Sequence, residues 1–301
     1  MNRTGIYLLI LLLIPFGGVS QVDPQISQFP LKKLVFNPAA IEKNEYINLH
    51  GLIRQQWTGF ENAPSTQYFG ISNYFEGLNV GLGLSIVNDK LGNENSQNIK
   101  LNYSYNFWLN EEVNITFGAG MGLITTRLET GDLVFEDGYD PALNEIGERK
   151  TRADFDLGTE VLYKDFTFGL SCLHFLKSTG NSTNFKIPRH YFLYGMYDLS
   201  ITEEIVLQPV ISLRKSGPVF QTGISALVHY KHMLSAGFSY RIEDALAIVA
   251  RYEVLPNIMI GYSYDLDTGP VRSFSSGSHE ISISARIAKQ AGVLKTPRYF
   301  D

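Results

Sequence analysis

The residues of this chain that could do chemistry are mainly carboxylates and a few histidines. Residues 128–150 hold a cluster of acidic side chains: Glu129, Asp132, Glu136, Asp137, Asp140, Glu145 and Glu148. Carboxylate oxygens are ligands for Ca²⁺, but this stretch lacks the regular spacing and the turn of an EF-hand loop. We therefore predict a solvated acidic loop and no metal site.

Catalytic chemistry is equally poorly supported by the sequence. The six histidines are scattered without ligand spacing, and neither His50 nor His174 has an obvious serine partner for nucleophilic catalysis. The chain contains no Gly-x-Ser-x-Gly elbow, His-Glu-x-x-His helix, phosphate-binding glycine loop or Cys-x-x-Cys pair. We expect no enzyme activity, no catalytic residues and no cofactor.

The first twenty residues have the pattern of a secretory signal peptide. Arg3 precedes an apolar run over residues 6–16, and the small residues Gly18 and Ser20 follow it. The run is shorter than the about 20 residues that a transmembrane helix needs. An exported chain with a single cysteine, Cys172, cannot form an internal disulfide. The net charge of −5 and the lack of basic patches argue against nucleic acid as a partner.

The remaining chain alternates apolar and polar residues with a period of two. Residues 78–86 and 99–107 each place Leu, Ile, Val, Tyr or Phe on one face and Asn, Ser, Gly or Lys on the other. Lipid-facing and lumen-facing residues alternate in this way in outer-membrane barrels, so their mean hydropathy is near zero, as it is here at −0.05. The soluble alternative is a two-sheet sandwich.

The runs predict about fourteen strands, an even number that suits a barrel with both ends of the strand ring in the periplasm. Their expected ranges are 46–55, 66–76, 79–89, 97–108, 111–127, 151–164, 166–176, 190–200, 204–214, 218–230, 232–241, 244–255, 257–265 and 279–288.

Loop lengths favour the membrane barrel over the sandwich. Connections after even-numbered strands are short, whereas those after odd-numbered strands include long ones, at 56–65, 90–96, 128–150, 177–189 and 266–278. Short exceptions occur near Gly217 and Glu243. This is the pattern of short periplasmic turns and longer outer loops. We predict an all-β fold: a transmembrane antiparallel β-barrel over residues 46–301, in the outer membrane of a Gram-negative bacterium.

The polar faces of the strands carry charges that would face the lumen. They are Lys100, Asp154, Asp156, Glu160, Arg241, Arg251, Glu253, Glu280 and Arg286. We prefer lumen solvation or salt bridges over a selectivity site as the explanation.

Residues 21–45 precede the first strand and are expected to form a plug or a periplasmic segment. They contain prolines and little periodicity, but they are more apolar than disordered tails usually are. The candidate plug residues are Pro24, Phe29, Phe36, Asn37 and Pro38. The alternative is a disordered leader.

Several short motifs of the chain resemble the PorP/SprF family. They are QVDPQISQF at 21–29, FNPAA at 36–40, RQQWTGF at 54–60, APSTQ at 63–67, GLGLSIVNDKLG at 81–92 and TPRYF at 296–300. Pro30 after Phe29, with Lys32 and Lys33, departs from the pattern of many relatives and affects only the expected conformation of that segment.

The resemblance implies an outer-membrane barrel that assists type IX secretion or gliding motility. It would recognise, export or anchor cargo such as large adhesins, with the cargo or its C-terminal domain and type IX components as partners. The alternatives are a passive or ligand-selective channel and a surface anchor without transport. Candidate contact residues in the 54–67 motif are Arg54, Gln56, Trp57, Gly59, Phe60, Ala63, Pro64, Thr66 and Gln67, and we prefer a structural clasp over direct cargo contact for this segment.

Overall fold

The computed structural model describes residues 25–129, 149–176, 187–231 and 233–289. The signal peptide at 1–20, Pro24, most of the acidic loop and the 296–300 motif lie outside these residues. Within the part of the chain that the structure describes, no helix is long and apolar enough to cross a membrane.

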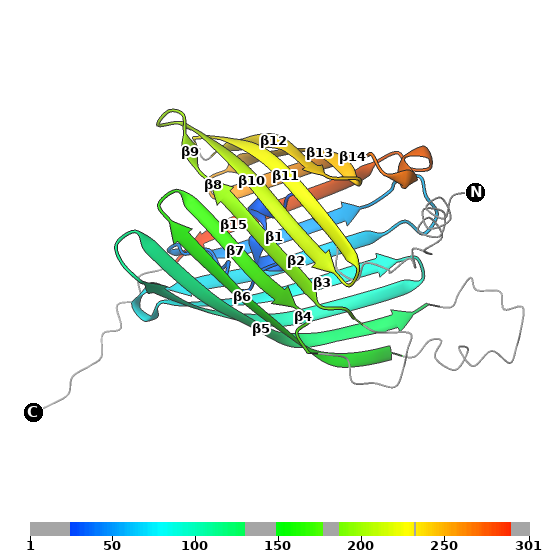
Figure 1. Cartoon of the computed structure of the whole chain (residues 1–301), viewed down its shortest axis with the longest axis horizontal. Helices are drawn as coiled ribbons and strands as arrows, with labels where there is room; N and C mark the ends of the chain where they lie inside the picture. The colour runs from blue at the N-terminus through cyan, green and yellow to red at the C-terminus, as the bar shows by residue number, and fades with distance from the viewer. Residues whose placement is uncertain (1–24, 130–148, 177–186, 232, 290–301) are drawn as a thin grey trace, which may run out of the picture.

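The described chain is a single antiparallel sheet that closes on itself (Figure 1). Its strands are β1 (Tyr46–Gln55), β2 (Ser65–Phe75), β3 (Val80–Leu91), β4 (Glu94–Trp108), β5 (Val113–Leu128), β6 (Arg149–Tyr163), β7 (Phe166–Leu173), β8 (His190–Tyr197), β9 (Leu199–Ser200), β10 (Ile205–Ser216), β11 (Val219–Tyr230), β12 (Leu234–Arg241), β13 (Ala245–Leu255), β14 (Ile258–Asp267) and β15 (Ser278–Ala288).

Closure comes from the pairing of β1 with β15, the first and the last of the described strands in the sequence. The two residues of β9 extend the pairing of β8 along β10, so the ring has 14 strands, as the alternation predicts. A closed ring leaves no unpaired strand edge, which is what a sheet in lipid requires.

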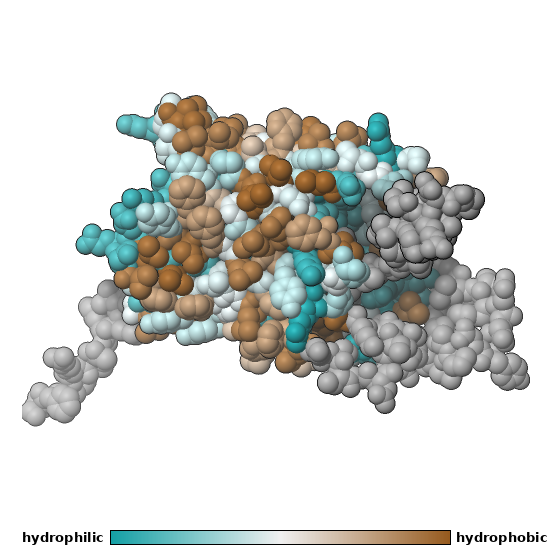
Figure 2. Space-filling model, viewed as in Figure 1, coloured by the Kyte–Doolittle hydropathy of each residue, from teal (hydrophilic) through white to brown (hydrophobic). Residues whose placement is uncertain are grey.

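The two faces of the ring differ in the way that the alternation predicts. On β4, Leu101 and Tyr103 are exposed, whereas Lys100 and Asn102, which alternate with them, are buried. The outer face is therefore apolar, and brown apolar side chains cover much of the strand surface in Figure 2. In a membrane, the apolar outer face contacts the hydrocarbon of the lipid, and the polar face lines the lumen of the barrel.

The prediction of a long connection at 90–96 is wrong. β3 continues to Leu91 and β4 starts at Glu94, so only Gly92 and Asn93 form the turn, with Gly92 at a φ of 58°. Ladder pairing extends through polar residues here because backbone bonding does not depend on the polarity of the side chains. The turns after β2, β6, β11 and β13 are short, as expected, and contain Asn79, Lys164, Lys231 and Asn257 at positive φ.

Residues 25–45 lie inside the ring and run along it from one end to the other. Ser27 contacts Arg241 and Asp265, near the end with the longer loops, whereas Lys43 contacts Asn114 at the start of β5, near the end with the short turns. Two 3₁₀ turns, η1 (Phe29–Leu31) and η2 (Lys33–Val35), shape the segment. All residues from Gln25 to Ile41 are buried or half-buried.

Candidate functional site

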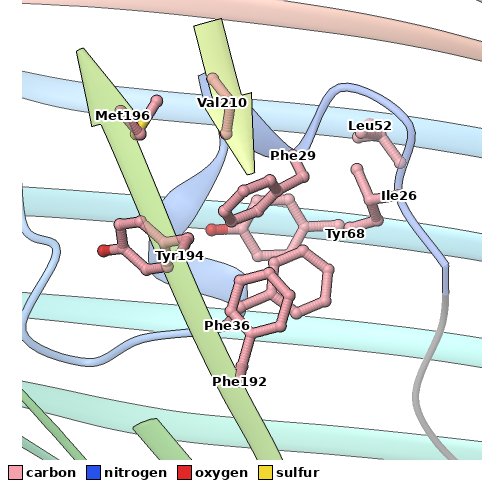
Figure 3. Packing of buried hydrophobic residues seen from close by; sticks show 9 residues of the cluster. All are labelled: Ile26, Phe29, Phe36, Leu52, Tyr68, Phe192, Tyr194, Met196 and Val210. Atoms are coloured by element: carbon pink, nitrogen blue, oxygen red, sulfur yellow. The ribbon is translucent and has the colours of Figure 1, made fainter. Parts of the chain in front are cut away.

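An aromatic cluster holds the middle of the N-terminal segment inside the barrel (Figure 3). The ring centroid of Phe29 lies 4.7 Å from that of Phe192, and Phe36 stacks on Phe192 at 5.0 Å. Tyr68 and Tyr194 complete the cluster from β2 and β8. The inward face of this barrel is thus partly apolar, and the N-terminal segment covers this apolar part.

A buried ionic clamp holds the start of the segment. Asp265 Oδ2 accepts bonds from Arg54 Nη2 and Arg241 Nη2, both at 2.8 Å, and from Ser27 Oγ at 2.7 Å. Glu280 accepts the backbone N–H groups of Ser27 and Gln28 and lies 3.3 Å from Arg54. Buried charges are tolerated because each carboxylate has both a guanidinium and a hydrogen-bond donor.

A second set of contacts holds residues 33–37. Lys33 Nζ lies 2.7 Å from Glu160, which also accepts the Tyr194 hydroxyl at 2.5 Å. The Asn37 amide donates to Tyr194 and to the backbone carbonyl of Thr159. Asn37 Oδ1 in turn accepts the backbone N–H of Ala39, which shapes the turn after it.

Inward-facing glycines make room for the segment on the strand walls. A Cβ atom at Gly118 would lie 2.2 Å from the backbone nitrogen of Ala39, and one at Gly158 would lie 2.1 Å from Asn37 Oδ1. Only a residue without a side chain allows this approach. Both glycines belong to the polar alternating face, and nothing in their local pattern distinguishes them from spacers.

A third cluster lies on β4, β6 and the residue after β7. Lys100 Nζ contacts Asp154 at 2.6 Å and Asp156 at 2.5 Å, and His174 Nδ1 lies 3.0 Å from Asp154. Asp154, Asp156 and His174 each offer a ligand atom within 4.8 Å of the others, a spacing compatible with a metal ion. The Lys100 ammonium already stands between the two carboxylates, so the cluster is explained as a charge-paired wall of the lumen.

The 54–67 motif is divided between two places. Arg54 and Thr66 point inward, Arg54 into the ionic clamp, whereas Gln67 is exposed on the outer side. Gln56, Trp57, Gly59, Phe60, Ala63 and Pro64 form the β1–β2 loop at the rim. Trp57 and Gly59 have positive φ values of 50° and 93°.

The β1–β2 loop is joined to the β14–β15 loop by backbone hydrogen bonds. Thr58 N–H donates to the Gly277 carbonyl and Ser276 N–H donates to the Thr58 carbonyl, both at 2.8 Å. Within the loop, Gln56 N–H donates to the Pro64 carbonyl at 2.9 Å. The side chain of Phe60 is 52 % exposed at the tip. The arrangement has the geometry of a clasp and also presents an apolar side chain to the outside.

The structure brings together some of the predicted residues and separates others. Phe29 and Phe36 share the aromatic cluster, Asn37 and Glu160 share the second set of contacts, and Pro38 is buried beside Gly158. Arg251 and Glu253 lie elsewhere, on the inward face of β13. Asp265 is a central residue that the sequence reasoning missed, and extending the alternation of 258–264 by one residue would have placed it on the polar face.

A closed antiparallel barrel with an apolar outer face and a lumen occupied by polar and charged side chains defines an outer-membrane β-barrel protein. The chain belongs to the family described as type IX secretion system membrane protein PorP/SprF, which matches residues 18–285. The protein is therefore an outer-membrane barrel associated with type IX secretion.

Solved structures with the same fold are outer-membrane transport proteins. The toluene transporter TbuX of Ralstonia pickettii has a TM-score of 0.53 at 11% identity, over 85% of this chain and 93% of that one. The CymD monoaromatic hydrocarbon channel has a TM-score of 0.52 at 13% identity, over 91% and 95%. At these identities the likeness shows the fold alone. No curated protein sequence matches the chain significantly.

Proposed function

We propose that this barrel is an accessory of type IX secretion or gliding motility that recognises specific cargo proteins, such as large adhesins, and helps to export or anchor them. It acts by protein recognition and carries out no chemical reaction. Membership of the PorP/SprF family supports the association with secretion. The observation that favours recognition over conduction is the occupied lumen.

The lumen contacts support this reading because they cross the whole width of the barrel. The ionic clamp joins the segment to β1, β12, β14 and β15, while Glu160 and Tyr194 join it to β6 and β8. A segment held from opposite walls occupies the path that a solute or an unfolded chain would take. We therefore propose that residues 25–45 act as a plug, and that cargo is recognised at the rims.

The β1–β2 loop is our candidate for part of that contact surface. The ring of Phe60 is exposed, which makes it available as an apolar anchor for a partner. The neighbouring clasp with residues 276–277 would hold the loop in one conformation and so lower the entropic cost of binding.

Affinity purification tests the proposal. The tagged protein is extracted from outer membranes in mild detergent, and the bound proteins are identified by mass spectrometry. We expect a large secreted protein or its C-terminal domain together with type IX components. Recovery of the barrel alone under conditions that preserve other outer-membrane complexes would contradict the proposal.

One phenylalanine variant and one tryptophan control test whether the β1–β2 loop contacts the cargo. Phe60→Ala removes the exposed ring and is expected to reduce cargo recovery at least tenfold, because an interface anchor contributes about 2 kcal/mol or more. Trp108→Ala is the matched control, since Trp108 is 62 % exposed at the opposite end of the barrel. Equal recovery of cargo with both variants would contradict a cargo contact at Phe60 and would favour a purely structural clasp.

The second candidate function is a passive or ligand-selective channel. The fold is shared with proteins described as a toluene transporter and a hydrocarbon channel, and a cavity of about 420 Å³ remains beside the segment. Uptake of a solute that depends on the protein, in membranes that hold no type IX components, would favour this alternative.

A further inference from the structure

A cavity of about 420 Å³ lies inside the barrel between the N-terminal segment and the walls, toward the end with the short turns. Asn257 of the β13–β14 turn and Arg286 near the end of β15 line it, which places its mouth at that end. Ligand cavities in proteins typically have volumes of about 300–1,000 Å³. The cavity is thus large enough for a small molecule or for the end of a chain.

Two cations deep in the cavity have no direct carboxylate partner among the described residues. The Lys32 ammonium is bonded to His50 Nδ1 at 2.9 Å and to the Ser284 hydroxyl. Arg251, on β13, also lines the cavity and repels Lys32, and its Nε atom is buried without a hydrogen-bond partner within the described part of the chain. Burying positive charge that is only partly compensated is costly, and an anion bound by the two groups would reduce that cost.

The other charges of the lining are already engaged or lie at the mouth. Lys33 is paired with Glu160, and Arg286 lies 3.5 Å from Glu253. Glu42 accepts a hydrogen bond from His50 Nε2 at 3.0 Å and also attracts both Lys32 and Arg251, while the exposed Asp198 accepts the Gln208 amide at 2.6 Å. One carboxylate of the lining, Glu42, thus attracts two cations, and an excess of positive charge remains at Lys32 and Arg251.

The remaining walls of the cavity are apolar. Leu31, Leu34, Val206 and Met259 line it, and Met259 is only 8% exposed. A ligand that fits this lining has one anionic head and an apolar body. A planar guanidinium and an ammonium that line one cavity suit a carboxylate, which accepts bonds at both oxygens.

We propose that this cavity is a binding site for a carboxylate carried on an apolar body, with Arg251 and Lys32 as the groups that hold the carboxylate. The same chemistry is offered by a medium-chain fatty acid and by the C-terminal carboxylate of a peptide with apolar side chains. The site is independent of the cargo-recognition function proposed above.

Isothermal titration calorimetry of the full-length protein in lipid nanodiscs tests the proposal. The probes are octanoate with 1-octanol as its uncharged partner, and N-acetyl-leucyl-leucine with its C-terminal amide as the partner. We expect at least one carboxylate to bind at least tenfold more tightly than its uncharged partner. The acid that shows the larger preference identifies the source of the ligand.

Arg251→Gln is the test variant and Lys164→Gln is its control. Arg251 makes no recorded hydrogen bond or ion pair with described residues, so its replacement is expected to leave the fold intact, whereas Lys164 lies at the same end of the barrel in an exposed pair with Glu112. We expect carboxylate affinity to fall at least tenfold in Arg251→Gln and to stay unchanged in Lys164→Gln.

A pH series on the unmodified protein gives a second measurement that needs no variant. Burial, followed by the repulsion of Arg251, lowers the pKa of Lys32 to about 7. Lys32 therefore loses its charge between pH 6 and pH 9, and carboxylate binding should weaken over that range. Equal binding of the charged and uncharged probes, no binding of either acid, or unchanged affinity in Arg251→Gln would overturn the proposal.

Discussion

At the scale of single residues, the N-terminal segment is held by a small number of buried charges. Asp265 receives two guanidinium groups and a hydroxyl on one oxygen atom, and Glu280 receives two backbone N–H groups of the segment. The intact network contributes more to stability than any single pair suggests, because removing one member leaves the other charges buried and unpaired.

Replacement of Asp265 by Asn tests the clamp with little change of shape. It leaves Arg54 and Arg241 buried with less negative charge, so the free energy of unfolding should fall by about 3 kcal/mol. Equilibrium urea unfolding in lipid vesicles measures this loss. Lys231→Gln, which removes an exposed pair with Glu204, should leave it nearly unchanged, and a similarly small effect of Asp265→Asn would contradict the clamp.

Lys32 makes stability depend on pH in a defined direction. The folded protein holds its pKa at about 7, below the usual 10.5, so between these values the unfolded chain binds the proton and the folded chain does not. Stability should therefore rise with pH from about 7 to about 10.5, by at most about 1.4 kcal/mol per pH unit.

The comparison with Lys32→Met isolates this contribution. The groups that face Lys32 are Arg251, Glu42, Glu280, His50 and Ser284, and they are the same in both proteins. The stability of the unmodified protein relative to Lys32→Met, measured by urea unfolding at pH 7, 8.5 and 10, should increase along the series. A flat difference would show that the Lys32 ammonium is solvated in the lumen.

At the scale of elements, the strands are shaped to receive the segment. Glycine is a poor strand residue, because it adds backbone entropy to the unfolded chain and offers no side chain to pack. On β5 and β6 that cost is offset because Gly118 and Gly158 lie under Ala39 and Asn37. The glycine pattern and the segment conformation depend on each other.

Gly118→Ala should displace the segment while leaving the ring closed. The new methyl group would lie 2.2 Å from the backbone nitrogen of Ala39, and backbone cannot rotate away as a side chain can. We expect a loss of about 1–3 kcal/mol and faster proteolysis within residues 25–45. Gly195→Ala is the matched control, since its methyl group would meet its nearest neighbour at an ordinary 3.6 Å. Equal proteolysis of the two variants would be incompatible with close packing at Gly118.

At the scale of the whole molecule, the described structure is a barrel whose lumen is occupied by residues 25–45 of the same chain. The segment enters at the ionic clamp, crosses the aromatic cluster and ends at Lys43 and Asn44 beside the first strand. The segment does not fill the lumen completely. A cavity of about 420 Å³ remains at the end of the barrel with the short turns.

Replacing residues 25–41 by a Gly/Ser segment of equal length tests whether the filling closes the barrel. We expect little single-channel conductance in planar bilayers from the unmodified protein and a large, stable conductance from the replacement, because the wall then faces water. The unmodified protein and the Gly195→Ala variant serve as controls for folding and insertion. Equal conductance of all three proteins would contradict the plug and favour the channel alternative.

Much of this architecture could be predicted from the sequence because it depends on local pattern. The period-two alternation determines which residues of each strand share a face, and the turn residues mark where strands reverse, so the strand ranges and the number 14 follow from short stretches. The same alternation placed Lys100, Asp154, Glu160 and Arg251 on the inward face. The 90–96 connection was misjudged, because polar residues do not end a strand when its backbone partner continues.

The tertiary structure alone decided which inward-facing residues meet. Ser27 and Glu280 are separated by most of the chain, and whether Arg54 joins a rim motif or a buried clamp depends on how the closed ring places β1 beside β15. Pairing between distant charges, glycines matched to a crossing segment and a cavity left between them arise only when the sheet closes, and no local periodicity encodes that closure.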